Sequence, residues 1–112
     1  FGGAQRFPAT VRSGAAVTAY GAVPAGDFAE GACVEVIVRP EAVTLRPMGA
    51  TENNFRIGDI RFLGRDWLVL LRNENFPALE PLRARVTSLD GLSVGAAAAI
   101  RFDPCGTFIF AA

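Results

Sequence analysis

The sequence predicts an all-β domain built from short strands. Apolar and polar residues alternate in several segments, which places apolar side chains on one face of each strand and charged side chains on the other. These segments recur at intervals of roughly 8 to 14 residues, with Gly, Pro and Asp between them. Helix signals are few, and 112 residues suffice for one domain with a modest core. The pattern is typical of a β-barrel or a β-sandwich.

The N-terminal third of the chain predicts three strands. Residues 9–12 and 16–20 form the first two, because a Ser-Gly pair makes a turn between them. Residues 24–27, which read PAGD, begin a loop. The third strand has the clearest period of two, and its apolar positions are Val34, Val36 and Val38.

The rest of the chain predicts further strands, which cover residues 43–46, 60–62, 67–71, 82–87, 100–102 and 107–110. Gly64 marks a tight hairpin turn before residue 67. The segment 67–71 reads WLVLL and is apolar on both faces, so it predicts the most buried strand. Helix content should be low, with one turn near Pro40.

The composition excludes most familiar enzyme sites. The chain has no histidine and no lysine, so all 11 of its positive charges are arginine. A Ser-His-Asp triad, a Cys-His pair, a Walker-A lysine, a Schiff-base lysine and a histidine-ligated zinc site are therefore impossible within it. The net charge of zero argues against nucleic acid as a partner. No apolar run reaches the roughly 18 residues of a membrane-spanning helix.

The two cysteines, Cys33 and Cys105, predict no metal centre. They do not form a CxxC motif, and a structural zinc site needs about four ligands. Free structural thiols are favoured over a disulfide, as in a reducing cytosol. Cys33 opens the valine-rich strand, which predicts that its thiol is buried.

Three arginines, Arg61, Arg83 and Arg85, are candidate ligands for a small anion. If their strands are neighbours, the polar faces of these strands would hold an oxyanion through bidentate hydrogen bonds. The alternative is that the arginines face water and pair with carboxylates, for which Glu74, Glu80 and Asp90 are available.

The aromatic residues predict a core and an edge. Phe62 and Trp67 fall on the core-facing phase of their strands and are expected to be buried. The segment of Phe108, Ile109 and Phe110 is apolar on both faces and lies near the end of the chain. An edge strand of this kind invites pairing with another copy, so these three residues are the candidate dimer interface.

Four segments, taken in order, resemble the TOBE-type C-terminal regulatory domain of ABC-importer ATP-binding subunits. Residues 36–45 read VIVRPEAVTL and are similar to the V-x-V-R-P-E-x-V-x-L stretch of that family. Residues 58–65, GDIRFLGR, resemble its G-x-V-x-F-L-G strand and turn. Residues 82–86, LRARV, and 100–104, IRFDP, continue the resemblance. The sequence of residues 62–66 is most similar to that of ferric-iron importers, and next to that of polyamine importers.

The resemblance implies an OB-like β-barrel without catalytic activity. It further implies that residues 1–8 are the last residues of an upstream ATPase domain and that residues 9–112 are the regulatory domain. The chain itself then needs no cofactor, whereas ATP and Mg²⁺ belong to the parent subunit. The implied partners are a second copy of the chain, the ATPase domain and a membrane permease, at the cytoplasmic side of a bacterial inner membrane. The implied function is dimerisation and regulation in ferric-iron import, and the alternatives are a small-oxyanion sensor or a polyamine-type importer.

Overall fold

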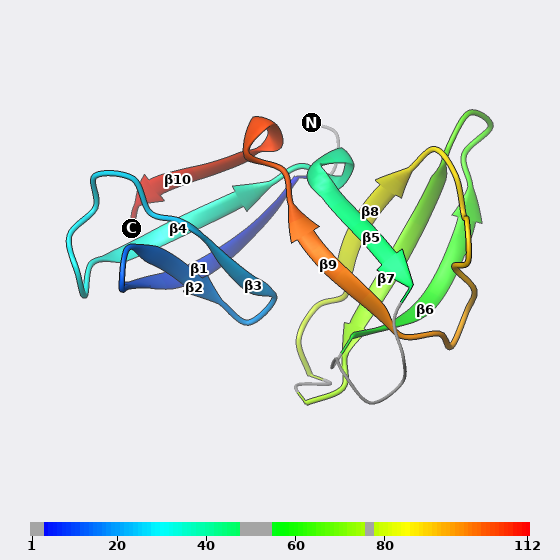
Figure 1. Ribbon diagram of the computed structural model, residues 1–112, viewed down its shortest axis with the longest axis horizontal. Coiled ribbons are helices and arrows are strands. Elements are labelled where there is room, and N and C mark those ends of the chain that lie inside the picture. Colours follow the sequence, from blue (N-terminus) through cyan, green and yellow to red (C-terminus); the bar gives the residue numbers. More distant parts are fainter. Residues whose placement is uncertain (1–3, 48–54, 76–77) are drawn as a thin grey trace.

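The computed structural model describes residues 4–47, 55–75 and 78–112, and shows an all-β chain (Figure 1). Its strands form one five-stranded, one two-stranded and one three-stranded sheet. The described residues contain two single-turn 3₁₀ helices, and no helix among them is long and apolar enough to cross a membrane. The predicted all-β class is confirmed, and the curled sheets make an OB-like half-barrel.

The five-stranded sheet forms one lobe of the molecule (Figure 1). All of its neighbouring strands are antiparallel, in the order β10-β4-β1-β2-β3. The strands are β1 (Gln5–Arg12), β2 (Ala15–Thr18), β3 (Gly21–Pro24), β4 (Cys33–Val38) and β10 (Thr107–Ala111). The chain leaves this lobe after β4 and returns to it through β10, so the first and last strands lie on either side of β4.

The second lobe contains the other two sheets. Strands β5 (Val43–Pro47) and β9 (Ala98–Phe102) pair with each other, and β6 (Phe55–Phe62), β7 (Trp67–Asn73) and β8 (Leu82–Val86) form a meander with β7 in the centre. The helices η1 (Pro40–Ala42) and η2 (Pro104–Gly106) connect the lobes. The helical turn predicted near Pro40 is confirmed.

The core follows the predicted period of two. Val34, Val36 and Val38 of β4 are at most 1% exposed, and Val69 and Leu71 of β7 are fully buried. The alternate residues of β7, Leu68 and Leu70, are only half-buried. The strand predicted to be most buried is therefore covered completely on one face only.

A polar network joins the two lobes. The Gln5 side chain, on β1, donates to the carbonyl of Pro81 at 2.9 Å and accepts from the backbone N–H of Arg83 at 2.7 Å. The Tyr20 hydroxyl donates to the carbonyl of Glu80, and the Asn73 side chain donates to the carbonyl of Ala19 at 3.1 Å. Because Gln5 and Asn73 are buried, these bonds fix how the lobes meet.

Four expectations need correction. Strand β3 was not predicted: residues 21–24 pair with β2, so Pro24 ends a strand and the predicted loop begins one residue later, at Ala25. The domain boundary expected after residue 8 falls inside β1, since Gln5 already pairs with Val38; residues 1–3 lie outside the described part.

Phe62, predicted to be core, is 60% exposed, because the β6–β7 hairpin extends beyond the β5–β9 pair (Figure 1). Cys33, predicted to be buried, is exposed, and both thiols are free as expected.

Candidate functional site

The candidate anion-binding arginines lie on one face of the three-stranded sheet. Arg61 of β6 and Arg85 of β8 both pair with Leu68 of β7, so they share the face of Leu68. Arg83 pairs with Leu70, two residues along, and lies on the same face. The opposite face packs into the core. The sheet therefore brings the three side chains to one surface, with β7 between Arg61 and the other two.

Each of these arginines is bonded to a carboxylate. Arg61 Nε lies 2.8 Å from Asp59 Oδ2, and Arg85 Nε lies 2.7 Å from Asp66 Oδ2. Arg83 Nη1 lies 3.4 Å from Glu80 Oε1. The three arginines therefore pair with nearby carboxylates, as the alternative to an anion site predicts. Of the acids proposed for it, Glu80 takes this role, whereas Glu74 pairs with Arg56.

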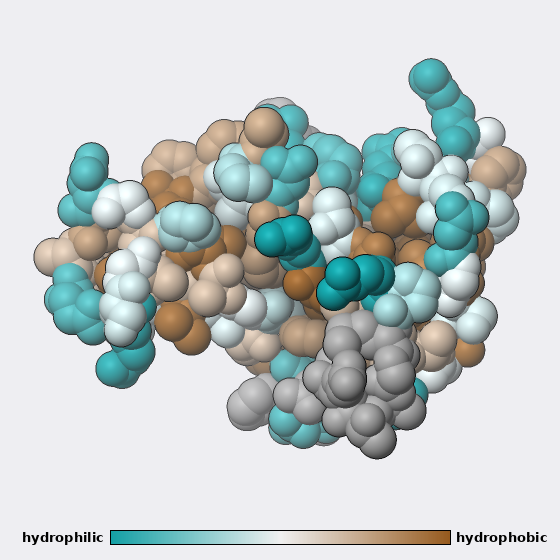
Figure 2. Space-filling model, in the orientation of Figure 1, coloured by the Kyte–Doolittle hydropathy of each residue, from teal (hydrophilic) through white to brown (hydrophobic). Residues whose placement is uncertain are grey.

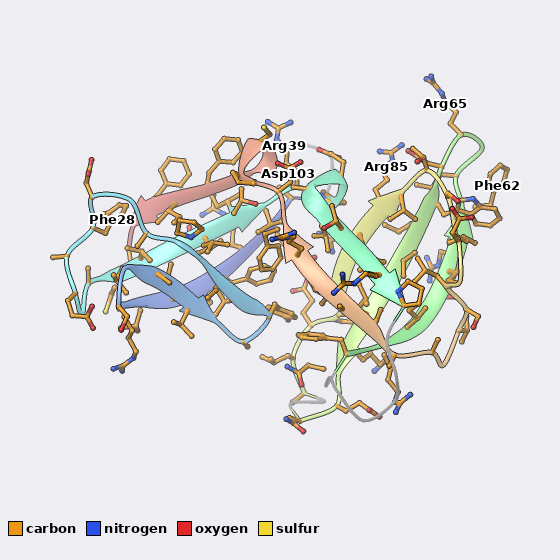
Figure 3. The ribbon with its side chains drawn as sticks, viewed as in Figure 1. Phe28, Arg39, Phe62, Arg65, Arg85 and Asp103 are labelled. Carbon is orange, nitrogen blue, oxygen red and sulfur yellow. The ribbon has the colours of Figure 1, made fainter. Side chains whose placement is uncertain are left out.

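The Arg85–Asp66 pair is the most enclosed of the three. The Asp66 side chain is 20% exposed, and its second oxygen, Oδ1, is buried without a hydrogen-bond partner in the part of the chain described. The same residue closes the β6–β7 hairpin, since its carbonyl accepts from the N–H of Leu63. Figure 3 shows Arg65 projecting from the tip of this hairpin and Arg85 projecting from β8. An anion that drew Arg85 away would leave Asp66 without its ion pair.

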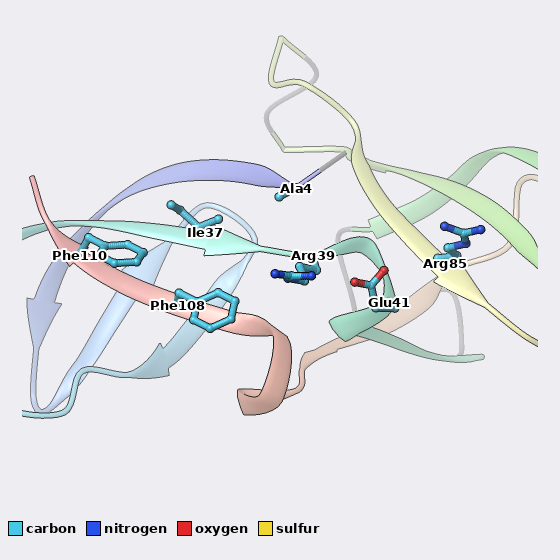
Figure 4. A pocket seen from close by; sticks show the side chains of 7 residues that line it. All are labelled: Ala4, Ile37, Arg39, Glu41, Arg85, Phe108 and Phe110. Carbon is cyan, nitrogen blue, oxygen red and sulfur yellow. The ribbon is translucent and has the colours of Figure 1, made fainter. Parts of the chain in front are cut away.

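A groove lies where the two lobes meet (Figure 4). It has a volume of about 420 Å³. Its lining is apolar at one end and charged at the other, and consists of Ala4, Ile37, Arg39, Glu41, Arg85, Phe108 and Phe110. The guanidinium of Arg39 lies 5.8 Å from the centre of the Phe108 ring, a cation–π arrangement. The structure shows no ion pair between Arg39 and Glu41.

The candidate interface residues occupy the edge strand β10, but on two different faces. Phe108 and Phe110 point outward and are 40% and 52% exposed. Ile109 points inward and packs against the core cluster beside Val36. The side chain of Ile109 therefore does not share the outward surface of the two aromatic rings, because successive side chains of a strand alternate between faces.

The outward aromatic surface continues onto the neighbouring strands. Phe108 lies beside Ile37 of β4, and Ile37 lies beside Arg6 of β1. Phe110 lies beside Glu35, which forms an exposed ion pair with Arg6 at 3.0 Å. In Figure 2 hydrophobic side chains gather in the region of β10, whereas hydrophilic side chains project at the ends of the molecule. An apolar strip with a charged border is typical of a protein interface.

At the hairpin of the other lobe, the exposed Phe62 packs against the half-buried Trp67. Their ring centres are 4.6 Å apart, and Figure 3 shows Phe62 at the outer side of that lobe. No group of three or more His, Cys, Asp or Glu side chains suited to a metal ion occurs in the described ranges. Sequence reasoning missed the buried role of Gln5, because a polar residue at the start of a strand is ordinarily exposed.

Comparisons with known proteins identify the family. The model of the TOBE domain family matches residues 36–110. A crystal structure of the cytoplasmic molybdate-binding protein ModG, with molybdate bound, has a similar fold: the TM-score is 0.68, the identity is 17%, and the alignment covers 96% of each chain. No curated protein sequence matches the chain. The family match covers well over half of the chain, which therefore belongs to the TOBE domain family.

Proposed function

We propose that this TOBE domain is the non-catalytic regulatory domain of an ABC-importer ATP-binding subunit, in which it holds two copies of the subunit together. Its family membership and the order of its four sequence segments support this assignment. The absence of lysine from the sequence agrees with it, because a Walker-A phosphate loop requires a lysine. ATP and Mg²⁺ are bound elsewhere in the parent subunit, and the domain itself needs no cofactor.

The observation that carries the proposal is the exposure of Phe108 and Phe110 on an edge strand. Aromatic side chains bury about 150–250 Å² each when fully covered. Since about half of each ring is already covered, an interface would remove roughly 100 Å² more per ring, worth about 2.5 kcal/mol at ~25 cal/mol per Å². Ile37 lies beside Phe108 and extends the same apolar surface.

We infer the wider setting from the resemblance to importer subunits. The hairpin at residues 62–66, FLGRD, is most similar to ferric-iron importers, and a polyamine-type importer is the alternative. The parent subunit would sit at the cytoplasmic side of a bacterial inner membrane, held there by its permease. The partners of this domain are then a second copy, the adjoining ATPase domain and, through the parent subunit, that permease.

Light scattering across a concentration series tests self-association. We expect the 112-residue chain to form a dimer and the double variant Phe108→Ser/Phe110→Ser to be a monomer. Phe62→Ser is the matched control, because Phe62 is also exposed but lies in the other lobe; this variant should remain a dimer. A monomeric wild-type chain at every concentration, or a dimeric double variant, would contradict the proposal.

Oxyanion binding is the second candidate function. Two observations favour it: the fold is similar to that of molybdate-binding ModG, and three arginines share one surface. A bound ligand stabilises the folded state by mass action, so molybdate, sulfate or phosphate should raise the melting temperature. The variant Arg83→Ala should abolish the rise, and Arg12→Ala, in the other lobe, should retain it. An unchanged melting temperature in all three anions, against chloride of equal ionic strength, would exclude this function.

A further inference from the structure

The two edges of the five-stranded sheet differ in protection. One edge is β3, a strand of only four residues with Pro24 at its end and Gly21 at a φ of 145°. Short length and proline are devices that prevent edge strands from pairing with other chains. The other edge, β10, has five residues that read TFIFA, with no charge, proline or glycine. In the described ranges no strand pairs with its outer side.

The hydrogen bonds between β10 and β4 show which backbone groups remain on the outer side. The N–H of Arg39 donates to the carbonyl of Gly106 at 3.0 Å, and the N–H of Ala112 donates to the carbonyl of Cys33 at 3.2 Å. In an antiparallel pair the bonded residues alternate along each strand. Residues 106, 108, 110 and 112 therefore face β4, and the backbone groups of the odd-numbered residues point to the open edge.

Three odd-numbered residues of β10 thus offer backbone groups for a further strand. Ile109 and Ala111 present both an N–H and a carbonyl. Thr107 presents its carbonyl alone, because its N–H already donates to the carbonyl of Pro104. These groups are self-complementary in an antiparallel pair. Thr107 at one end of the strand, which offers only a carbonyl, lies opposite Ala111 of the second copy, which offers an N–H.

We propose that two copies of this chain pair their β10 strands antiparallel about a two-fold axis at Ile109, and so join the five-stranded sheets into one. This proposal rests on the proposed self-association and specifies its geometry. Ile109 of each copy exchanges both backbone hydrogen bonds with Ile109 of the other, and each Ala111 N–H donates to the Thr107 carbonyl of the other copy. The interface is isologous, as expected for a two-fold dimer.

This register places the aromatic side chains opposite each other. Phe108 of one copy faces Phe110 of the other, and the two-fold axis generates the pair twice. Both are at positions without hydrogen bonds across the new interface, where opposing Cα atoms are only about 4.5 Å apart and side chains are closest. Aromatic cross-strand pairs contribute to sheet stability at such positions. Registers centred on Phe108 or Phe110 pair fewer residues of β10 and leave one aromatic ring of each copy without its counterpart.

Disulfide trapping distinguishes these registers. In a Cys33→Ser/Cys105→Ser background, Phe108→Cys and Phe110→Cys are made as separate proteins of different mass. We expect oxidation of the mixture to give a disulfide-linked dimer with one copy of each, and either protein alone to give no more linked dimer than the cysteine-free background. A disulfide between two copies of Phe108→Cys, or between two copies of Phe110→Cys, would overturn the register.

Amide hydrogen exchange provides a test without substitutions near the interface. We expect the amides of Ile109 and Ala111 to gain protection as the protein concentration rises, because their N–H groups become bonded only in the dimer. The amides of Phe108 and Phe110, which face β4, should be protected at every concentration. A dimer by light scattering whose Ile109 amide stays unprotected would overturn this pairing but leave self-association intact; a monomer by light scattering would overturn both.

Discussion

The side-chain carbonyl of Gln5 accepts a hydrogen bond of 2.7 Å from the backbone N–H of Arg83, which joins β1 of one lobe to β8 of the other. The same side chain donates to Glu80 and Pro81. Gln5 is 5% exposed, so its amide is bonded almost entirely to protein. Gln5 therefore bridges the two lobes through hydrogen bonds at both ends of its amide.

Substitution of Gln5 by Ala should therefore destabilise the domain by about 2–3 kcal/mol, because it removes the side-chain bonds of Gln5 to Glu80, Pro81 and the N–H of Arg83 from a buried position. The free energy of unfolding in urea measures the effect. The control is Arg6→Ala at the neighbouring position, which breaks only the exposed pair with Glu35 and should change stability by less than about 1 kcal/mol. Equal effects of the two variants would show that the Gln5 network contributes little.

Tyr20 provides a pH test of the same junction. Burial first, and then the negative charge of Glu80, raise the pKa of its phenol above the ordinary value of 10.0. The folded state therefore holds the phenolic proton more tightly than the unfolded state. The stability that the protonated phenol of Tyr20 contributes is complete below pH 10. It falls as the pH rises above 10, until the pKa of the folded state is passed. Tyr20 is the one tyrosine of the sequence, so the phenolate absorbance reports it without interference.

We expect the phenolate of the folded protein to appear at higher pH than that of the urea-unfolded protein. Tyr20→Phe should remove this part of the pH dependence and lower stability near neutral pH by about 1 kcal/mol, through loss of the bond to the Glu80 carbonyl. Coincident titrations of the folded and unfolded protein would contradict the prediction.

Most strands were predictable because their burial follows a simple period. The valines of β4 repeat at every second position, and the structure buries all three. Strand β3 was missed because its glycine and proline are ordinary loop signals, and its pairing with β2 is a tertiary effect. The burial of Phe62 was predicted wrongly for a different reason. The alternation of apolar and polar residues predicts the face of the strand on which a side chain lies, but not whether another part of the protein covers that face.

The candidate sites were predictable in part. Alternation along one strand brings Arg83 and Arg85 to one face, but their partners depend on contacts that the sequence does not display. Asp66 reaches Arg85 because the register of β7 against β8 places Arg85 opposite Leu68, two residues after Asp66. The apolar edge at Phe108 was visible in the sequence, whereas the inward direction of Ile109 followed only from its pairing with Val36.

Gly106 and Ala42 provide a test of the connection between the lobes. A Cβ added at Gly106 would lie 2.6 Å from the Cβ of Ala42, closer than real Cβ atoms approach. Gly106→Ala should therefore destabilise the domain by about 1–3 kcal/mol, since η1 and η2 must move apart. In the double variant Gly106→Ala/Ala42→Gly the clash disappears, so its loss of stability should be smaller than the sum of the two single losses. Strictly additive losses would show that the clash is relieved in another way.

Asp59 and Arg61 give a direct probe of anion binding at the arginine face. The hydrogen bond from Arg61 lowers the pKa of the Asp59 carboxyl from its ordinary value of 3.8. The stability contributed by this pair is complete above pH 3.8 and is lost as the pH falls through the lowered pKa of the folded state. Arg61→Ala should return the pKa of Asp59 towards its ordinary value, which a carbon NMR titration of the carboxyl group measures.

Sulfate then separates the two proposed functions, because it stays ionised throughout this titration. If sulfate binds Arg61, it competes with Asp59 for the same guanidinium, and the pKa of Asp59 should rise when sulfate replaces chloride at equal ionic strength. If the domain only self-associates through β10, the pKa should be the same in both salts, since β10 belongs to the other lobe. A rise that persists in Arg61→Ala would show that sulfate acts on Asp59 by another route, and would count against an anion site at this face.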